Sequence, residues 1–369
     1  MNLLAAVAGL FLILLVLWDA FETILLPRRV SGQGRPSRLV LDSLWVAWAQ
    51  FARTIPGRAA RENALGLYAI LSLLALLCVW AGGLIAGFAV LTWAAGSPFI
   101  GAMGPQRFLT DLYVSGTTFF TLGLGDIAPA TRFTRALMVV EAGTGFGFLA
   151  MVISYLPVLY QAFSRRESRI VVLDEWAGSP PSAAVLLRRS AESGSGDVLA
   201  PFLHDWEVWS AELLESHISY PILAFFRSQH SNQSWVASLT AVLDTCALVI
   251  TGAQGAASFQ ARLTFAIARH AVVDLTQALR LRPEPPPADR LPTADLAKLR
   301  AWLGGAGVRL DEDAGAEARL AELRAMYEPY VASLSRHLLM PLPGWLPPEK
   351  ARFNWQTTAW ARTGKGDAH

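Results

Sequence analysis

The chain has 369 residues, of which 53% are apolar and 16% are charged, and its mean hydropathy is +0.37. Soluble domains carry about 25% charged residues, so this composition argues against an all-soluble protein and excludes a disordered chain, a collagen-like repeat and a coiled coil. The formal charge of +2 provides no basic surface for nucleic acid. The two cysteines, Cys78 and Cys246, exclude a disulfide framework and a four-cysteine zinc site.

Three apolar segments predict three membrane-spanning helices. Residues 66–95 contain no charge, and as a helix they would measure about 45 Å against a hydrocarbon core of about 30 Å. Residues 136–160 carry only one charge, Glu141, and residues 3–26 are apolar except for two acids. The first segment lacks a basic start and a small-residue cleavage site, so we expect an uncleaved anchor rather than a signal peptide.

The distribution of arginine predicts the orientation. Residues 27–65 contain seven arginines and residues 96–133 contain two, while three more follow the third segment at positions 165, 166 and 169. Arginine-rich connections stay on the inner side of a membrane. We therefore expect a multi-pass protein of a bacterial plasma membrane, with its N-terminus outside and its C-terminal half in the cytoplasm.

The connection between the first two segments contains a further helical pattern. Its apolar residues recur at helical spacing and leave charged residues on the other side. This predicts a helix that either lies on the inner leaflet or packs against other helices. The apolar residues are Leu41, Leu44, Trp45, Trp48 and Phe51.

Two acids, Asp19 and Glu22, interrupt the first segment on its cytoplasmic half. Charged side chains inside a membrane span are costly, so they pair with a partner or mark a function. We expect pairing with Arg28, with Arg29 or with another span, and a role in gating or proton sensing is the alternative. The segment has no ladder of arginines, so voltage sensing of the usual kind is not predicted.

The part between the second and third segments contains the residues that point to a function. Residues 108–120 fit a short helix, which Thr121, Leu122, Gly123, Leu124, Gly125 and Asp126 follow. Non-helical backbone is tolerated at membrane depth only where it is buried in protein or lines water. Glycines at alternate positions let successive carbonyls point the same way, and such a row can replace the water shell of a cation. One chain cannot supply a ring of these oxygens, whereas four copies can.

Residues 66–163 resemble the pore module of tetrameric potassium channels, which consists of an outer helix, a pore helix, a filter and an inner helix. The filter pattern of that family is T-V-G-Y-G-D, and Thr121, Gly123, Gly125 and Asp126 match it. In the family, a tyrosine stands at the position of Leu124 and braces the filter. Some two-pore-domain channels resemble this chain in having leucine there in one of their filters. The resemblance implies a homotetramer whose filter carbonyls and Thr121 hydroxyl coordinate permeant K⁺, with Asp126 at the outer mouth.

The third segment has the features of an inner helix. Gly145 lies 19 residues after the last filter residue, which is where family inner helices carry a hinge glycine. Pro157 lies lower, and its missing N–H can kink a helix. The resemblance implies that both residues let the helix bend, and close helix packing is the alternative for Gly145. Glu141 is expected to support the filter through Thr117 or Thr118, or to face the cavity.

The second half of the chain predicts a mostly α-helical cytoplasmic part. It contains no strand followed by G-x-G-x-x-G and no cyclic-nucleotide β-roll, so its ligand or regulator stays unassigned. Residues 235–252 are apolar enough for a fourth span, but Asp244 at their centre and the need to flip the C-terminus argue against one. Helical patterns cover residues 197–217, 220–230, 234–252, 257–281, 293–303 and 316–338.

A polar cluster in this half suggests a divalent metal site. It lacks the H-E-x-x-H spacing, so a solvated, ion-paired helix face is the favoured interpretation. The cluster consists of His204, Asp205, Glu207, Glu212, Glu215 and His217.

We therefore expect an all-α membrane protein with three transmembrane helices, a re-entrant pore helix and a filter, followed by a helical cytoplasmic domain. The expected function is a potassium channel subunit, with no enzymatic activity and no cofactor beyond permeant K⁺. The alternatives are a weakly selective cation channel, a membrane-anchored signalling protein with a pore-like scaffold, and a metal-dependent enzyme. The expected parts are an anchor (1–30), a connection (31–65), a pore module (66–163), a helical domain (164–282) and a Pro-rich linker with the C-terminal part (283–369).

Overall fold

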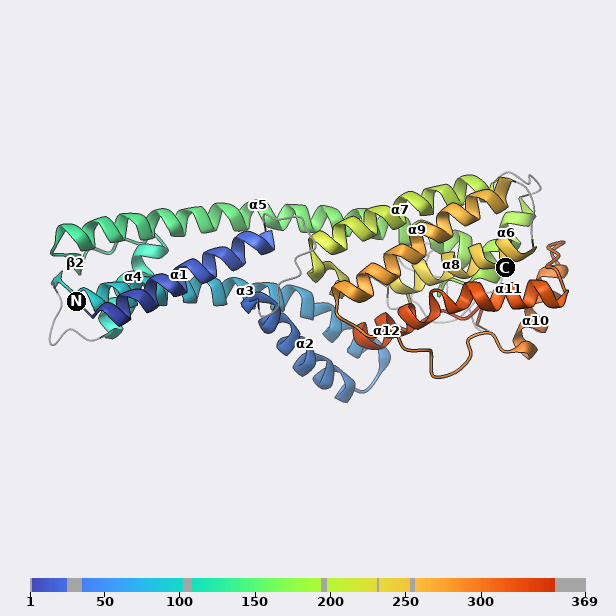
Figure 1. Cartoon of the computed structure of the whole chain (residues 1–369), viewed down its shortest axis with the longest axis horizontal. Coiled ribbons are helices and arrows are strands. Elements are labelled where there is room, and N and C mark those ends of the chain that lie inside the picture. The colour runs from blue at the N-terminus through green and yellow to red at the C-terminus, as the bar shows by residue number, and fades with distance from the viewer. Residues whose placement is uncertain are drawn as a thin grey trace, which may run out of the picture. The chain divides into compact units, whose positions relative to one another are not determined.

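A computed structural model describes residues 2–24, 35–101, 108–193, 198–230, 232–252 and 256–348. The chain divides into two compact units, Met1–Ala162 and Phe163–His369, and the described residues are mainly α-helical (Figure 1). The predicted all-α membrane fold is confirmed. Within the described residues, four helices are long and apolar enough to cross a membrane: α1 (Leu3–Ile24), α3 (Arg58–Ala94), α5 (Arg132–Ala177) and α8 (Trp235–Gly252).

In the first unit, α1 lies antiparallel along α3 (Figure 1). The backbone N–H of Asn2 donates to the carbonyl of Ala94 over 3.0 Å, which joins the start of α1 to the end of α3. Glycines bring the two backbones close, since a Cβ on Gly87 would lie 2.6 Å from Cγ1 of Ile13 and one on Gly9 would lie 2.8 Å from the carbonyl oxygen of Gly87. Such contacts between small residues are typical of helices that pack in membranes.

The connection between α1 and α3 contains α2 (Pro36–Thr54), and this helix packs on α3. Trp45 is buried, and the ring N–H of Trp48 donates to the carbonyl of Ala64 over 2.9 Å. Of the two interpretations of the helical pattern, packing against a neighbouring helix is therefore the one observed for these tryptophans. Leu44 and Phe51 stay exposed.

The segment between α3 and α5 folds back on itself. The short strands β1 (Phe99–Ile100) and β2 (Ala128–Pro129) pair antiparallel and bring its two ends together. Between them lies α4 (Phe108–Phe119), which ends one residue before the predicted helix 108–120. The helix α5 runs 17 residues beyond the predicted end at 160, because no glycine interrupts the chain between Gly147 and Gly178.

The second unit is built around α8. Its apolar window is 83% buried inside the protein, by α9 and by α6, α11 and α12 among others. A helix that is apolar on all sides is either a membrane span or the core of a larger unit, and enclosure by other helices accounts for the uniform apolarity of α8. The remaining elements are α6 (Ala183–Glu192), α7 (Leu199–Ser219), the 3₁₀ helix η1 (Pro221–Phe225), α9 (Ala256–Ala278), α10 (Thr293–Gly304), α11 (Ala314–Ala325) and α12 (Glu328–Leu338).

Three predictions for this unit are wrong. The predicted helix 220–230 is only the short η1, because Pro221 ends α7 and the Arg166 guanidinium donates to the carbonyls of Leu223 and Phe226, where the chain leaves the helix. The predicted helix 316–338 is two helices, α11 and α12, since Pro329 has no N–H to continue the hydrogen bonds of α11 and is tolerated only in the first turn of a new helix. The prediction also omitted α6. Arg28 and Arg29, the predicted partners of Asp19 and Glu22, lie outside the described residues.

Candidate functional site

The backbone of the predicted filter alternates in handedness. Thr121, Gly123 and Gly125 have φ angles of 56°, 55° and 75°, whereas Leu122 and Leu124 between them lie outside this left-handed region. Alternation between right- and left-handed conformations turns successive peptide groups to a common side. Positive φ is uncommon for threonine, so the surrounding structure must hold Thr121 in this conformation.

The inner end of the filter is tied to the C-terminal end of α4. The backbone N–H of Leu122 donates to the carbonyl of Thr117 over 2.8 Å, and that of Thr121 donates to the carbonyl of Thr118 over 3.0 Å. These bonds use carbonyls that the end of a helix leaves without intrahelical partners. The left-handed turn at Thr121 is thereby fixed to the end of α4.

The outer end of the filter is tied by a residue that the sequence analysis did not assign. The hydroxyl of Tyr113, in the middle of α4, donates to Oδ2 of Asp126 over 2.9 Å. Because α4 runs in one direction and the filter returns in the other, a residue 13 positions before Asp126 can reach it. The Leu124 side chain is 61% exposed in the single chain.

Gly145 lies against the end of α4. A Cβ built on it would stand 2.0 Å from the carbonyl oxygen of Phe119, whereas one on Gly143 or Gly147 would meet nothing within 4 Å. The observed role of Gly145 is therefore close packing. The helix α5 is continuous through Gly145 and Pro157, so bending at either residue stays a prediction.

Glu141 has a different partner from those predicted. Its carboxyl group is 2% exposed and hydrogen-bonds to the hydroxyl of Ser115, not to Thr117 or Thr118. The reason is the helical position of Ser115, which turns its hydroxyl to α3 and α5 and also places it 2.7 Å from the carbonyl oxygen of Ile85. Ser115 therefore connects α4 to both neighbouring helices behind the filter.

The apolar face of α5 is uncovered in the single chain. Only 11% of its most apolar window is buried, against 28% for α1 and 39% for α3. All six residues from Thr121 to Asp126 are also exposed. The exposed large apolar residues of α5 include Val139, Val140, Phe146, Leu149, Ile153, Leu156 and Tyr160.

The predicted polar cluster of the second unit is not brought together. His204 lies at the surface, where its Nδ1 is 3.1 Å from Oε2 of Glu207. His217 lies in the core, where its Nε2 is 3.1 Å from Nη1 of Arg166. Burial and the neighbouring guanidinium hold the pKa of His217 well below its usual value. The described residues contain no group of three or more His, Cys, Asp or Glu side chains placed to hold a metal ion.

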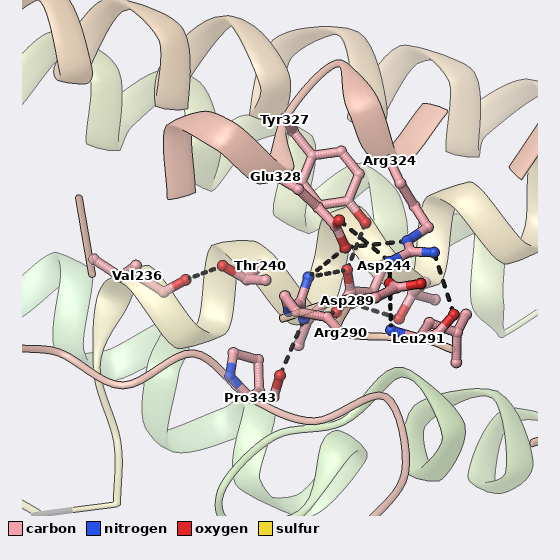
Figure 2. Close-up of polar contacts among 12 residues, drawn as sticks. Val236, Thr240, Asp244, Asp289, Arg290, Leu291, Arg324, Tyr327, Glu328 and Pro343 are labelled. Carbon is pink, nitrogen blue, oxygen red and sulfur yellow. Dashed lines mark hydrogen bonds and ion pairs between the residues drawn. The ribbon is translucent and has the colours of Figure 1, made fainter. Parts of the chain in front are cut away.

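A second buried charge cluster surrounds Asp244 at the centre of α8 (Figure 2). Arg290 donates to both carboxylate oxygens over 3.1 and 2.6 Å, and the hydroxyl of Tyr327 donates to Oδ1 over 2.5 Å. Glu328 joins the cluster by pairing with Arg290 over 3.2 Å and with Arg324 over 3.1 Å. Each of these carboxylates pairs with at least one arginine, so the cluster holds α8 against α11 and α12.

Comparisons with known proteins agree with the geometry of the first unit. Residues 84–161 match the model of a protein family described as "Ion channel". The resemblance to pore-loop channels is thus confirmed over residues 84–161, which run from the last part of α3 through α4 into α5. The match leaves out α1, α2 and the whole of the second unit.

The chain is also similar to the uncharacterized membrane protein YdjJ of Bacillus subtilis (strain 168). The two are 26% identical over 153 residues, which are 38% of this chain and 40% of the relative. The similarity thus spans less than half the length of either protein. No solved structure matches the chain.

Proposed function

We propose that this chain is the subunit of a homotetrameric potassium channel in the plasma membrane. In the proposed complex, four copies of residues 121–126 surround one axis and conduct K⁺ down its gradient. The N-terminus lies outside and the second unit lies in the cytoplasm, as the positions of the arginines favour.

The observation that carries this proposal is the alternating backbone of the filter, tied at both ends to α4. The carbonyls of Thr121, Leu122, Gly123 and Leu124, with the Thr121 hydroxyl, replace the water shell of the ion in single file. Removing that shell without replacement costs tens of kcal/mol, so many oxygens must act together. Asp126 attracts cations to the outer mouth.

The exposure of α5 supports assembly. A helix with 11% of its apolar window buried leaves a large face for lipid or for other copies. In a four-fold arrangement, one face of α5 borders the water-filled cavity and the adjacent faces contact neighbouring subunits. Bending of α5 at Gly145 or Pro157 then opens the inner end, and the second unit biases this opening through an unassigned ligand or partner.

The test is ion flux through the purified protein in liposomes under K⁺ and Na⁺ gradients. Gly123→Ala is a suitable variant because a Cβ there meets nothing within 4 Å in the chain, whereas its φ of 55° is strained for alanine. Gly147→Ala is the matched control, since it also has open space and lies in a regular helix. We expect K⁺ flux that Gly123→Ala abolishes and Gly147→Ala retains.

A weakly selective cation channel is the second candidate, and the exposed Leu124 favours it. The family tyrosine at this position braces the filter, and leucine forms no hydrogen bond. Equal K⁺ and Na⁺ flux that Gly123→Ala abolishes identifies this candidate. Absence of flux together with a monomeric mass in native mass spectrometry rejects both channel proposals and leaves the membrane-anchored scaffold.

A further inference from the structure

The helix α2 begins without a capping side chain of its own. Its N-cap residue is Arg35, which forms no side-chain cap, and Pro36 follows at the first helical position. The first N–H groups of a helix need an acceptor from elsewhere. In this chain the acceptor comes from α1, because the backbone N–H of Ser37 donates to Oδ2 of Asp19 over 3.0 Å.

Asp19 gathers donors from both α2 and α3. The same Oδ2 accepts from the ring N–H of Trp80 in α3 over 2.8 Å, and Oδ1 accepts from the hydroxyl of Ser37 over 2.8 Å. The guanidinium of Arg35 lies 3.7 Å from Oδ1 and also pairs with Glu22 over 3.3 Å. Asp19 is 2% exposed, so these donors replace the water that it would otherwise bind.

We propose that Asp19 is a positioning residue that caps α2 from a neighbouring helix and joins α1, α2 and α3 into one rigid body. The glycine contacts between α1 and α3 complete this body at its other end. Of the apolar windows of α1, α3 and α5, that of α5 is the least enclosed, so the gating motion occurs in α5 against a fixed frame. The part of the proposal that concerns gating rests on the proposed channel function. Both α1 and α2 lie outside residues 84–161.

The cap is tested by trypsin digestion of the protein in liposomes, followed at Arg38 in the first turn of α2. Asp19→Ala removes every acceptor, and we expect cleavage there to rise about fivefold or more, as loss of an N-cap implies. Asp19→Asn is the matched control, because its oxygen still accepts from Ser37 and Trp80 while its amide donates to the Ser37 hydroxyl. The asparagine variant should therefore digest like the original protein. Equal digestion of Asp19→Ala and the original protein overturns the cap.

The rigid body is tested by a disulfide between α1 and α2. The hydroxyls of Thr23 and Ser37 are 3.4 Å apart, so Thr23→Cys with Ser37→Cys can form one. With Cys78→Ser removing the exposed thiol, we expect K⁺ flux to stay within about twofold of the reduced protein, because these helices do not separate in gating. A loss of flux that reducing agent restores overturns the proposal. If the reduced protein conducts no ions, the channel function fails, and the digestion experiment still decides the cap.

Discussion

The backbone of Gly145 packs directly against the carbonyl of Phe119, so that a Cβ at this position would lie 2.0 Å from the oxygen. This carbonyl belongs to the last residue of α4, two residues before the filter begins. The contact therefore sets how closely α5 approaches the root of the filter. The sequence suggests Gly145 as a hinge, whereas the structure shows that the lack of a side chain at this position lets α5 pack closely against α4.

Gly145→Ala is expected to destabilise the protein. Alanine favours a helix over glycine by about 1 kcal/mol, but overpacking costs about 1–3 kcal/mol and a rigid backbone carbonyl places this site at the upper end. We expect the Tm of the solubilised protein to decrease by a few degrees. Gly143→Ala and Gly147→Ala have open space and should leave Tm unchanged or raise it. A Tm for Gly145→Ala equal to that of these controls would contradict the packing role.

Tyr113→Phe removes the hydroxyl that holds Asp126. The bond is exposed, so water replaces it in the variant and the Tm should change little. The filter loses its outer attachment, and we therefore expect lower K⁺ flux and a smaller preference for K⁺ over Na⁺ in liposomes. Tyr160→Phe, at an exposed position of α5, is the control. If flux and ion preference match those of the control, the hydrogen bond from Tyr113 to Asp126 is not needed for either.

His217 should make the stability of the protein depend on pH. Its pKa in the folded protein lies well below the usual value, because the ring is buried beside the guanidinium of Arg166. The other groups at the ring are the Ser216 hydroxyl and Trp235, and Glu167 pairs with Arg166. Below about pH 6.5 the unfolded chain binds a proton that the folded chain excludes, so stability decreases with falling pH by about 1.4 kcal/mol per pH unit.

Thermal unfolding between pH 5 and pH 8 measures this dependence. His217→Gln keeps an acceptor for Arg166 and should flatten the acid side of the Tm profile. His204→Gln is the control, because His204 is exposed and should leave the slope in place. An unchanged slope in His217→Gln would assign the acid sensitivity to other groups.

Arg290→Met should strongly destabilise the second unit. The substitution leaves Asp244, which is fully buried, without its bidentate partner, and a buried ion pair broken on one side costs about 3–5 kcal/mol. Replacing both partners, with Asp244→Leu and Arg290→Met, should cost less than the single change, because Asp244 no longer leaves a charge without a partner and Glu328 keeps Arg324. Thermal unfolding of the full chain measures both. Lys298→Met breaks an exposed ion pair and should leave Tm unchanged.

The sequence predicts well those parts of the fold whose conformation depends on the residues of one short segment. Gly123 and Gly125 accept left-handed backbone angles without steric cost, so their alternate spacing indicates the alternating backbone of this segment from the sequence alone. The apolar lengths of α1 and α3 likewise follow from the thickness of a bilayer.

The missed features depend on contacts between distant residues. Ser115 is an ordinary small residue in the sequence, and only the arrangement of three helices brings it to Glu141. The break before α12 places Tyr327 where its hydroxyl reaches Asp244, 83 residues earlier in the chain. The predicted helix 220–230 does not form in full, and the carbonyls of Leu223 and Phe226 accept hydrogen bonds from Arg166, which is more than 50 residues earlier in the chain. Periodicity carries no information on such pairings.

Asp19 and its donor Trp80 are 61 residues apart in the chain. A ribosome therefore completes α1, with its acid, well before the indole that binds this acid has been made. Arg35 and Ser37 can reach Asp19 as soon as α2 has been made, but the carboxylate lacks the indole donor until α3 arrives. The order of synthesis thus leaves a buried acid short of one donor in chains that stop before Trp80, and we expect such chains to be degraded faster than complete ones.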